Sequence, residues 1–222
     1  MECIYIPELT SEHDKIDVPQ QEEQHVKALR LKSGDQILAV NGTGLECICE
    51  IRFKDKHAYL NIFGKAEAFP PKYITLAFGM ILDRDRMEYL IEKCTEIGVS
   101  EFQPLFTKHS QRKTFKTERF TKKAIAAMKQ SRRAILPKIN EPMKLEEFMK
   151  NQKGTIITTD YAGNTDYNIA EKKAIILIGP EGGFSPEEIE RIKQKAKYNW
   201  RISDNRLRTE TAAVIASSFA IS

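Results

Sequence analysis

The stretch Leu177–Glu190, LIGPEGGFSPEEIE, joins the end of an apolar run to a glycine-rich turn and the start of a helix. Ser185 is a suitable N-cap, and Pro186 fits the first helical position. The two glutamates that follow complement the positive end of the helix dipole. A strand that leads through a tight turn into a helix is the repeating unit of an α/β fold, so the stretch predicts that fold class.

The composition of this turn also restricts the ligands that it accepts. Glycine-rich turns before helices often bind phosphate. Here Glu181 lies inside the turn and the first helical turn is acidic, so a phosphate would be repelled. We expect a neutral or positively charged ligand that is approached closely by the backbone of Gly182 and Gly183. The alternative is a tight turn before a capped helix, with no ligand.

Beyond residue 72, strand-like and helix-like segments alternate, which favours a parallel sheet with helices on its faces. The helix expected at 84–97 carries its apolar residues on one stripe and stops at Gly98. The chain ends in a helix of small residues that can pack closely against its neighbours. The expected strands are 73–80, 102–106, 155–159 and 174–178, and the other expected helices are 119–131 and 186–196.

Residues 1–69 have a different pattern, in which short strand-like segments are separated by turn residues. This pattern is typical of a small β-barrel. The stretch Phe69–Lys72, FPPK, interrupts regular structure and marks a linker. We therefore expect a barrel domain at 1–69 and an α/β domain at 70–222. The expected strands of the first domain are 3–6, 36–40, 46–53 and 58–63, and its expected helix is 20–31.

The composition argues against a membrane protein and against a metal site. No apolar run reaches the roughly 20 residues that span a bilayer, and the acidic N-terminal residues do not form a signal peptide. We expect a cytoplasmic protein with no membrane partner. The four cysteines include no CxxC pair, so we expect buried thiols and no metal.

Positive charge is concentrated in one segment. Residues 108–140 contain eleven Lys and Arg against one acid, a local excess of +10 in a chain whose net charge is +4. This segregation is typical of a surface that binds nucleic acid. Arg119, Lys122, Lys129 and Arg133 recur at helical spacing, which predicts a cationic stripe on one side of the helix. The alternative is a lysine-rich helix face that contacts only solvent.

Four segments together resemble one known family. They are HVKALRLKSGD (25–35), EKCTEIGVSEFQPLFTKHSQRK (92–113), the stretch at 177–190, and LRTETAAVIA (207–216). In order and content they are similar to the bacterial E-type methyltransferases that modify uridine N3 in small-subunit ribosomal RNA. That family belongs to the trefoil-knotted SPOUT class. The resemblance implies a knotted α/β SPOUT methyltransferase domain with a parallel sheet, preceded by a small PUA-like β-barrel, and a homodimer that pairs through the knot region.

The resemblance also implies a cofactor, S-adenosylmethionine (SAM). SAM is net cationic at neutral pH, which agrees with an acid-flanked turn. In proteins of this kind the GPEGG loop (residues 179–183) and the LRTETA segment (residues 207–212) wrap the cofactor. The cofactor-binding residues implied here are Gly179, Glu181, Gly182, Gly183, Ile202, Leu207, Thr209 and Thr211.

The implied reaction is methylation of N3 of a uridine in 16S rRNA or the small ribosomal subunit. This imide nitrogen is a poor nucleophile until its proton leaves, so catalysis must accept that proton or stabilise the charge that spreads onto the flanking carbonyl oxygens. Arg208 is the candidate stabiliser, and Glu210 is the candidate proton acceptor or positioning residue. An ion pair of Arg208 with Glu181 or Glu210 is an equally weighted alternative for the arginine.

The expected RNA contacts come from both domains. Where many members of the family have a lysine, this chain has Asp83, and Glu92 stands where a glutamine is common. The arginines beside Asp83 are expected to keep a phosphate contact. The predicted RNA-binding residues are His25, Arg30, Arg84, Arg86, Lys108, His109, Arg112, Lys113, Gln130 and Arg133. For His25, a histidine satisfied by backbone is an equal alternative.

Two other functions remain as alternatives. One is a knotted methyltransferase that acts on tRNA or on a ribose 2′-hydroxyl. The other is a ribosome-binding assembly factor without catalysis. Binding of SAM separates the second alternative from both enzymatic functions.

Overall fold

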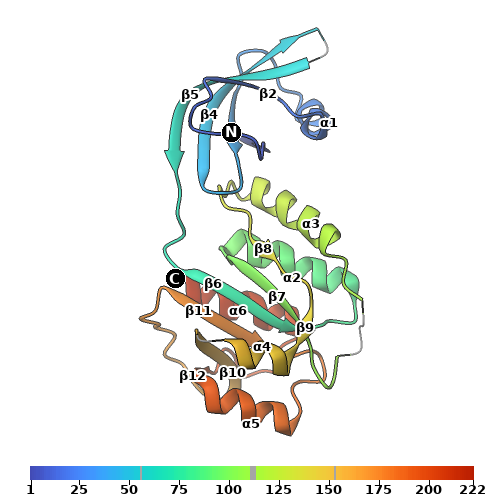
Figure 1. Ribbon diagram of the computed structural model, residues 1–222, viewed down its shortest axis with the longest axis vertical. Coiled ribbons are helices and arrows are strands. Elements are labelled where there is room, and N and C mark those ends of the chain that lie inside the picture. The colour runs from blue at the N-terminus through green and yellow to red at the C-terminus, as the bar shows by residue number, and fades with distance from the viewer. Residues whose placement is uncertain (56, 111–113, 153) are drawn as a thin grey trace. The chain divides into compact units, whose positions relative to one another are not determined.

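The computed structural model describes residues 1–55, 57–110, 114–152 and 154–222, which form two compact units (Figure 1). Unit 1 comprises Met1–Phe69 and Ile125–Leu136, and unit 2 comprises Pro70–Ala124 and Pro137–Ser222. The units part at the expected linker, but the sequence-based boundaries did not include the second segment of unit 1. That these units are separate domains stays a prediction.

Unit 1 contains a five-stranded sheet with the order β1-β3-β4-β5-β2, in which β1 and β3 are parallel and the other pairs antiparallel. The four expected strands are present, and β2 is a short addition. The helix ends three residues earlier than expected, at Ala28, and Arg30 has a left-handed φ of 55°. The elements are β1 (Glu2–Tyr5), β2 (Lys15–Asp17), α1 (Gln20–Ala28), β3 (Gln36–Val40), β4 (Leu45–Lys54) and β5 (His57–Glu67).

The segment Ile125–Leu136 belongs to unit 1 because its apolar residues complete a cluster there. Met128 and Ala134 are buried together with three residues of the sheet, Cys3, Leu38 and Val40. The same segment contributes an ion pair in which Lys129 Nζ lies 2.8 Å from an oxygen of Glu22, and the two side chains are only 15% and 8% exposed. A buried pair of this kind fixes the segment, since either charge alone is costly to bury.

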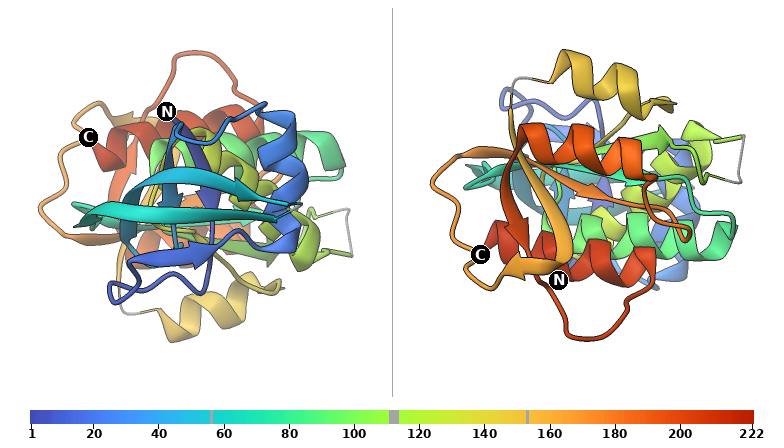
Figure 2. Two further views of the ribbon diagram at one scale, coloured as in Figure 1. Left: turned by 90° about the horizontal axis from the view of Figure 1, so that it is seen from above. Right: turned by 90° about the horizontal axis from the view of Figure 1, so that it is seen from below.

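Unit 2 is an α/β layer structure. Its sheet has the order β12-β10-β11-β6-β7-β8, with β9 beside β7, and every pair is parallel, as expected. Helices α2 and α6 cover one face and α4 and α5 the other (Figure 2). The elements are β6 (Tyr73–Gly79), α2 (Arg84–Ile97), β7 (Glu101–Phe106), α3 (Thr117–Gln130, which continues into unit 1), β8 (Lys138–Ile139), β9 (Met143–Lys144), α4 (Leu145–Asn151), β10 (Thr155–Asn164), β11 (Lys173–Ile178), α5 (Pro186–Lys195), β12 (Ala196–Trp200) and α6 (Thr209–Ile221).

Helices α2 and α6 pack closely because α6 offers small residues. The expected apolar stripe of α2 is buried, and it includes Leu90, Ile91 and Cys94. On α6, small residues such as Ala213 and Ser217 are buried, and Ser217 Oγ lies 3.9 Å from Cys94 Sγ. All four cysteines are buried free thiols, as expected.

The described ranges contain neither a metal-binding cluster nor a membrane-spanning helix. In residues 1–55, 57–110, 114–152 and 154–222, no group of His, Cys, Asp and Glu lies together in a way that could hold a metal ion. Within the same ranges, no helix has the length and apolar character that crossing a membrane requires.

The environment of Glu101, at the start of β7, makes the stability of the fold depend on pH. Its carboxylate accepts hydrogen bonds from Asn140 Nδ2 at 2.6 Å and from Tyr73 Oη at 3.0 Å. Burial alone would raise the pKa of Glu101, but these bonds and Lys138 hold it below its ordinary value. A depressed folded-state pKa stabilises the fold above the ordinary pKa and loses that contribution as the pH falls through the folded value.

We therefore expect Glu101→Gln to melt at a lower temperature than the wild type at pH 7, and the gap to close as the pH falls below about 4. Thermal melting from pH 7 to pH 3 measures the gap. Glu12→Gln, at an exposed position, is the control and should track the wild type throughout. A gap that stays constant with pH would exclude the ionised Glu101 as its origin.

Candidate active site

A cavity of about 910 Å³ lies in unit 2 at the carboxyl ends of β10 and β11. Open parallel sheets bind their ligands at this edge. The cavity is lined by the middle of β10, where its pairing with β11 ends, by the loop between β11 and α5, by one side of α5, and by the segment that leads into α6. The GPEGG loop and the LRTETA segment therefore meet at one site, although the first ends more than twenty residues before the second begins.

Most of the expected cofactor residues line this cavity. Thr209 Oγ1 donates to the carbonyl oxygen of Gly179 at 3.1 Å, which joins the LRTETA segment directly to the GPEGG loop. Thr211 does not line the cavity. Thr209 and Ala212, three positions apart, form the cavity-facing side of α6, and Thr211 lies on another side. The expected residues that line it are Gly179, Glu181, Gly182, Gly183, Ile202, Leu207 and Thr209.

Three glycines at this site, Gly183, Gly182 and Gly79, occupy positions that a side chain would disturb. Gly183 has φ +70°, and a Cβ there would meet no atom within 4 Å, so its requirement is conformational. At Gly182, a Cβ would lie 2.9 Å from Cβ of His109. At Gly79, the last residue of β6, a Cβ would lie 2.3 Å from Cδ of Pro180. The backbone of the loop is thus held closely by β6 and by His109, and space beside Gly183 is open.

The two acids that follow the GPEGG loop, Glu187 and Glu188, form hydrogen bonds at the N-terminus of α5. Ser185 and Glu188 form a capping box, in which Ser185 Oγ accepts from Glu188 N and Glu188 Oε2 accepts from Ser185 N. Glu187 accepts from Ser185 Oγ and from Lys108 Nζ. Of the three acids noted in the sequence, Glu181 is the one that lines the cavity.

Arg86 links two carboxylates of the site. Its Nε and Nη2 donate to the two oxygens of Glu210 at 2.8 and 2.6 Å, and its Nη1 lies 3.4 Å from Glu181 Oε1. Burial would raise the pKa of Glu210, whose side chain is 8% exposed, but the hydrogen bonds from Arg86 hold that pKa below its ordinary value. Glu210 is thus an ionised, fully engaged carboxylate.

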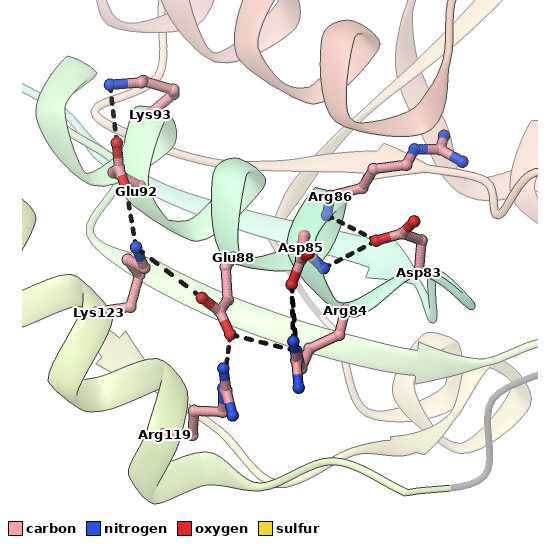
Figure 3. A network of polar contacts seen from close by, with 9 residues as sticks. All are labelled: Asp83, Arg84, Asp85, Arg86, Glu88, Glu92, Lys93, Arg119 and Lys123. Carbon is pink, nitrogen blue, oxygen red and sulfur yellow. Dashed lines mark hydrogen bonds and ion pairs between the residues drawn. The ribbon is translucent and has the colours of Figure 1, made fainter.

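Asp83 orients Arg86 from the preceding turn. Its carboxylate caps α2 by accepting hydrogen bonds from the backbone N–H groups of Asp85 and Arg86 (Figure 3). The hydrogen bond from Arg86 N, with that from Asp85 N, lowers the pKa of Asp83. The departure from the usual lysine therefore supplies a helix cap at this position.

The cations of the expected stripe on α3 are paired with carboxylates. In unit 2, Arg119 Nε lies 2.5 Å from Glu88, and Lys123 Nζ lies 3.0 Å from Glu92 (Figure 3). Lys122 pairs with Glu118 one turn away, and Lys129 forms the buried pair with Glu22 in unit 1. Three members of the predicted stripe, Arg119, Lys122 and Lys129, are thus paired with carboxylates, and the partners of Arg119 and Lys129 are distant in sequence.

Three other expected RNA-binding residues of unit 2, Arg84, Lys108 and His109, also have partners within the protein. Arg84 pairs with Asp85 at 3.1 Å, and Lys108 with Glu187 at 3.3 Å. His109 Nδ1 lies 3.0 Å from the carbonyl oxygen of Gly182, so the histidine braces the GPEGG loop. Arg112 and Lys113 lie outside the described residues.

In unit 1, the expected RNA-binding residues have different surroundings. His25 is half-buried with Nε2 at 3.4 Å from the carbonyl oxygen of Cys3, which agrees with the backbone-satisfied alternative. Arg30 and Gln130 are exposed. Burial lowers the pKa of the Arg133 guanidinium to about 10. An RNA-binding role for these four residues stays a prediction.

Arg208 lines the cavity from its place just before α6 and is exposed. The carboxylates considered as its partners, Glu181 and Glu210, both lie against Arg86. Within the described part of the chain, Arg208 has no ion pair, so its guanidinium is available to a ligand.

The sequence did not single out several parts of the cavity wall. These parts include the middle of β10 (Thr158–Tyr161), Asn199 near the end of β12, and Arg206. Asn199 Oδ1 is buried and has no hydrogen-bond partner among the described residues. Position was an available signal for β10, because Asp160 and Tyr161 directly follow the strand that was predicted at 155–159 in the parallel sheet.

Comparison with known proteins agrees with this architecture. Residues 69–221 match a family model described as an RNA methyltransferase domain, and residues 24–63 match an RNA methyltransferase PUA domain. The chain is 32% identical to the ribosomal RNA small subunit methyltransferase E of Aquifex aeolicus, over 87% of this chain and 88% of the relative. It is 29% identical to the protein of the same name from Rickettsia conorii, over 96% and 92%.

Two solved structures share the fold. A Legionella pneumophila protein in complex with SAM is 30% identical, with a TM-score of 0.84 over 97% of this chain and 95% of the other. The ribosomal RNA small subunit methyltransferase E of Neisseria gonorrhoeae, bound to SAM, has a TM-score of 0.89 over 98% and 95% at 23% identity. From its PUA domain to its helix α6, the chain belongs to the ribosomal RNA small subunit methyltransferase E family of RNA methyltransferases.

Proposed function

We propose that this protein transfers a methyl group from SAM to N3 of a uridine in 16S rRNA. The observation that carries the proposal is the single cavity in which the GPEGG loop and the LRTETA segment meet. The relatives named above act on small-subunit ribosomal RNA by name, and the Legionella structure holds SAM.

The residues of the cavity fit SAM. Glu181 offers a carboxylate to a cationic ligand, and its contacts with Arg86 and with the backbone of Leu82 are made through Oε1. The buried oxygen of Asn199 is an acceptor that lacks a donor, and the space beside Gly183 is open. SAM, when bound, supplies a methyl carbon on a positively charged sulfur.

Two residues of the protein have separate roles in the proposed reaction. Arg208 stabilises the negative charge that spreads onto the uridine carbonyl oxygens as N3 loses its proton. Glu210 acts as a positioning residue, because its low pKa and its two hydrogen bonds to Arg86 make it a poor proton acceptor. N3 takes part in base pairing, so the uridine must be unpaired or turned out of its stack.

The proposal includes the trefoil knot and a homodimer that pairs through the knot region. The hydrogen bond between Thr209 and Gly179 supports the first point, because the two loops of such a knot lie side by side. Analytical ultracentrifugation of the purified protein tests the second.

Small-subunit rRNA from a strain that lacks this protein should lack one N3-methyluridine, and the purified enzyme with SAM should restore it. Nucleoside mass spectrometry measures both. If that nucleoside persists in the deletion strain and a tRNA or ribose methyl group is lost, the substrate is different. If calorimetry detects no saturable binding of SAM, the protein is a ribosome-binding factor without catalysis.

A further inference from the structure

A short excursion interrupts β10 at the rim of the cavity. In the pairing of β10 with β12, Thr159 and Asn164 both lie opposite Trp200, so the four residues between them bulge out of the ladder. Asp160 Oδ1 accepts from Ala162 N at 2.8 Å. At Gly163, a Cβ would lie 2.5 Å from the backbone of Trp200. The excursion is therefore held by a side-chain hydrogen bond and by a close backbone contact.

The excursion presents an aromatic ring beside the cavity. Tyr161 lines the cavity and is 58% exposed. An exposed aromatic side chain on a fixed backbone loses little conformational entropy when a planar ligand stacks on it. The mechanism proposed above does not use this residue.

Lys193 and Arg206 are two of the cations that line this cavity together with Tyr161. Lys193 comes from α5 and Arg206 from the segment before α6. In the described ranges, neither side chain has an ion-pair partner, whereas the cations of α3 are paired. Unpaired cations together with an exposed aromatic ring are the combination that binds single-stranded nucleic acid, in which cations contact phosphates and rings stack on bases.

The cavity is large for a small-molecule site. Its volume of about 910 Å³ is near the upper end of the roughly 300–1,000 Å³ typical of small-molecule sites. A base that is turned out of its stack must lie beside the methyl donor. Room for a nucleotide next to the cofactor is therefore expected in this cavity.

We propose that Tyr161, Lys193 and Arg206 form a nucleotide subsite, in which the tyrosine ring stacks on an RNA base and the two cations contact neighbouring phosphates. This inference rests on the proposed function. It places an RNA contact on β10, on α5 and in the segment before α6, all outside the basic sequence segment 108–140.

Kinetics with in vitro transcribed 16S rRNA test the stacking. Stacking on one base contributes about 1–3 kcal/mol, so Tyr161→Ala should raise KM for the RNA roughly 5- to 150-fold. Tyr161→Phe keeps the ring and should retain a KM close to that of the wild type. Tyr89→Ala is the matched control, since Tyr89 is 48% exposed and lies outside the cavity lining.

Calorimetry with SAM and thermal melting complete this test. The SAM dissociation constant and the melting temperature should stay unchanged in all three variants. If Tyr161→Ala weakens SAM binding as much as RNA binding, the ring contacts the cofactor and the proposal is wrong. An unchanged KM for the RNA would also overturn it. Failure of the wild type to bind SAM or methylate RNA would instead refute the proposed function.

The salt dependence of RNA binding tests the cations. Each phosphate contact to a single strand contributes about 0.7 to the slope of log K against log salt concentration. Arg206→Gln and Lys193→Gln should each lower the slope by about this amount. Lys150→Gln, which removes an exposed cation that is paired with Glu146 on α4 and lies outside the cavity lining, is the control and should leave the slope unchanged. Equal slopes in all variants would remove the two cations from the subsite.

Discussion

Replacing Arg86 with methionine is expected to lower the free energy of unfolding by about 3 kcal/mol, because the substitution leaves Glu210 buried without its partner. Glu210 receives two hydrogen bonds from this guanidinium, and its side chain is 8% exposed. The same substitution releases Glu181 from Arg86. SAM binding should therefore weaken together with stability. Urea denaturation and calorimetry measure the two effects.

The matched control for this prediction removes the negative charge of Glu210, which Arg86→Met leaves buried without a partner. Arg86→Met combined with Glu210→Gln should recover part of the lost stability, because a neutral amide is less costly to bury than an unpaired carboxylate. Arg86→Lys should restore less stability than this double variant, because a lysine cannot donate two parallel hydrogen bonds to one carboxylate. If Arg86→Met unfolds at the same urea concentration as the wild type, the pair does not stabilise the fold.

Gly79→Ala is expected to lower the rate of methyl transfer roughly 100-fold, because a displacement of about 1 Å in a positioning element has an effect of that size. The new Cβ would lie 2.3 Å from Cδ and 2.5 Å from N of Pro180, so the GPEGG loop must move. We also expect the free energy of unfolding to fall by about 2 kcal/mol from overpacking. A radioactive methyl-transfer assay and urea denaturation measure these effects.

Gly64→Ala is the control for Gly79→Ala, since it also adds a methyl group to a glycine in a strand. There the new Cβ would lie 3.4 Å from Cβ of Ile48, an ordinary contact. Gly64→Ala should retain the wild-type rate. Wild-type activity in Gly79→Ala would mean that the loop tolerates displacement and that the close approach of β6 is not required for catalysis.

The elements that local signals specify were predicted well. Helix α2 begins and ends where the sequence indicated, at Arg84 and Ile97. Its apolar stripe, the capping side chain of Asp83 and Gly98 at φ 127° are all properties of the segment itself. The parallel sheet also followed from the alternation of strands and helices.

The elements that depend on long-range pairing were not predicted. Strand β12 begins at Ala196, which is also the C-cap of α5, so no turn residue separates the two elements. Strands β8 and β9 have two residues each, and their pairing with β7 defines them. A sequence pattern cannot reveal a strand of this length.

In the candidate site, too, local motifs were predicted and long-range contacts were not. The GPEGG loop and the LRTETA segment were recognised as motifs, but the role of Arg86 was not. Its partner Glu210 lies 124 positions away in the chain. The charge of the basic segment was counted correctly, yet its neutralisation by Glu22, Glu88 and Glu92 depends on contacts that only the folded chain makes.

The contribution of Met128 and Ala134 to unit 1 limits how this protein can be divided. A fragment that ends at Phe69 would leave Cys3, Leu38 and Val40 without the residues that cover them in the intact chain. It would also leave the carboxylate of Glu22 without its ammonium partner. The N-terminal sheet is therefore not an independent module. A gene fusion that moved it to another protein would also have to include residues 125–136.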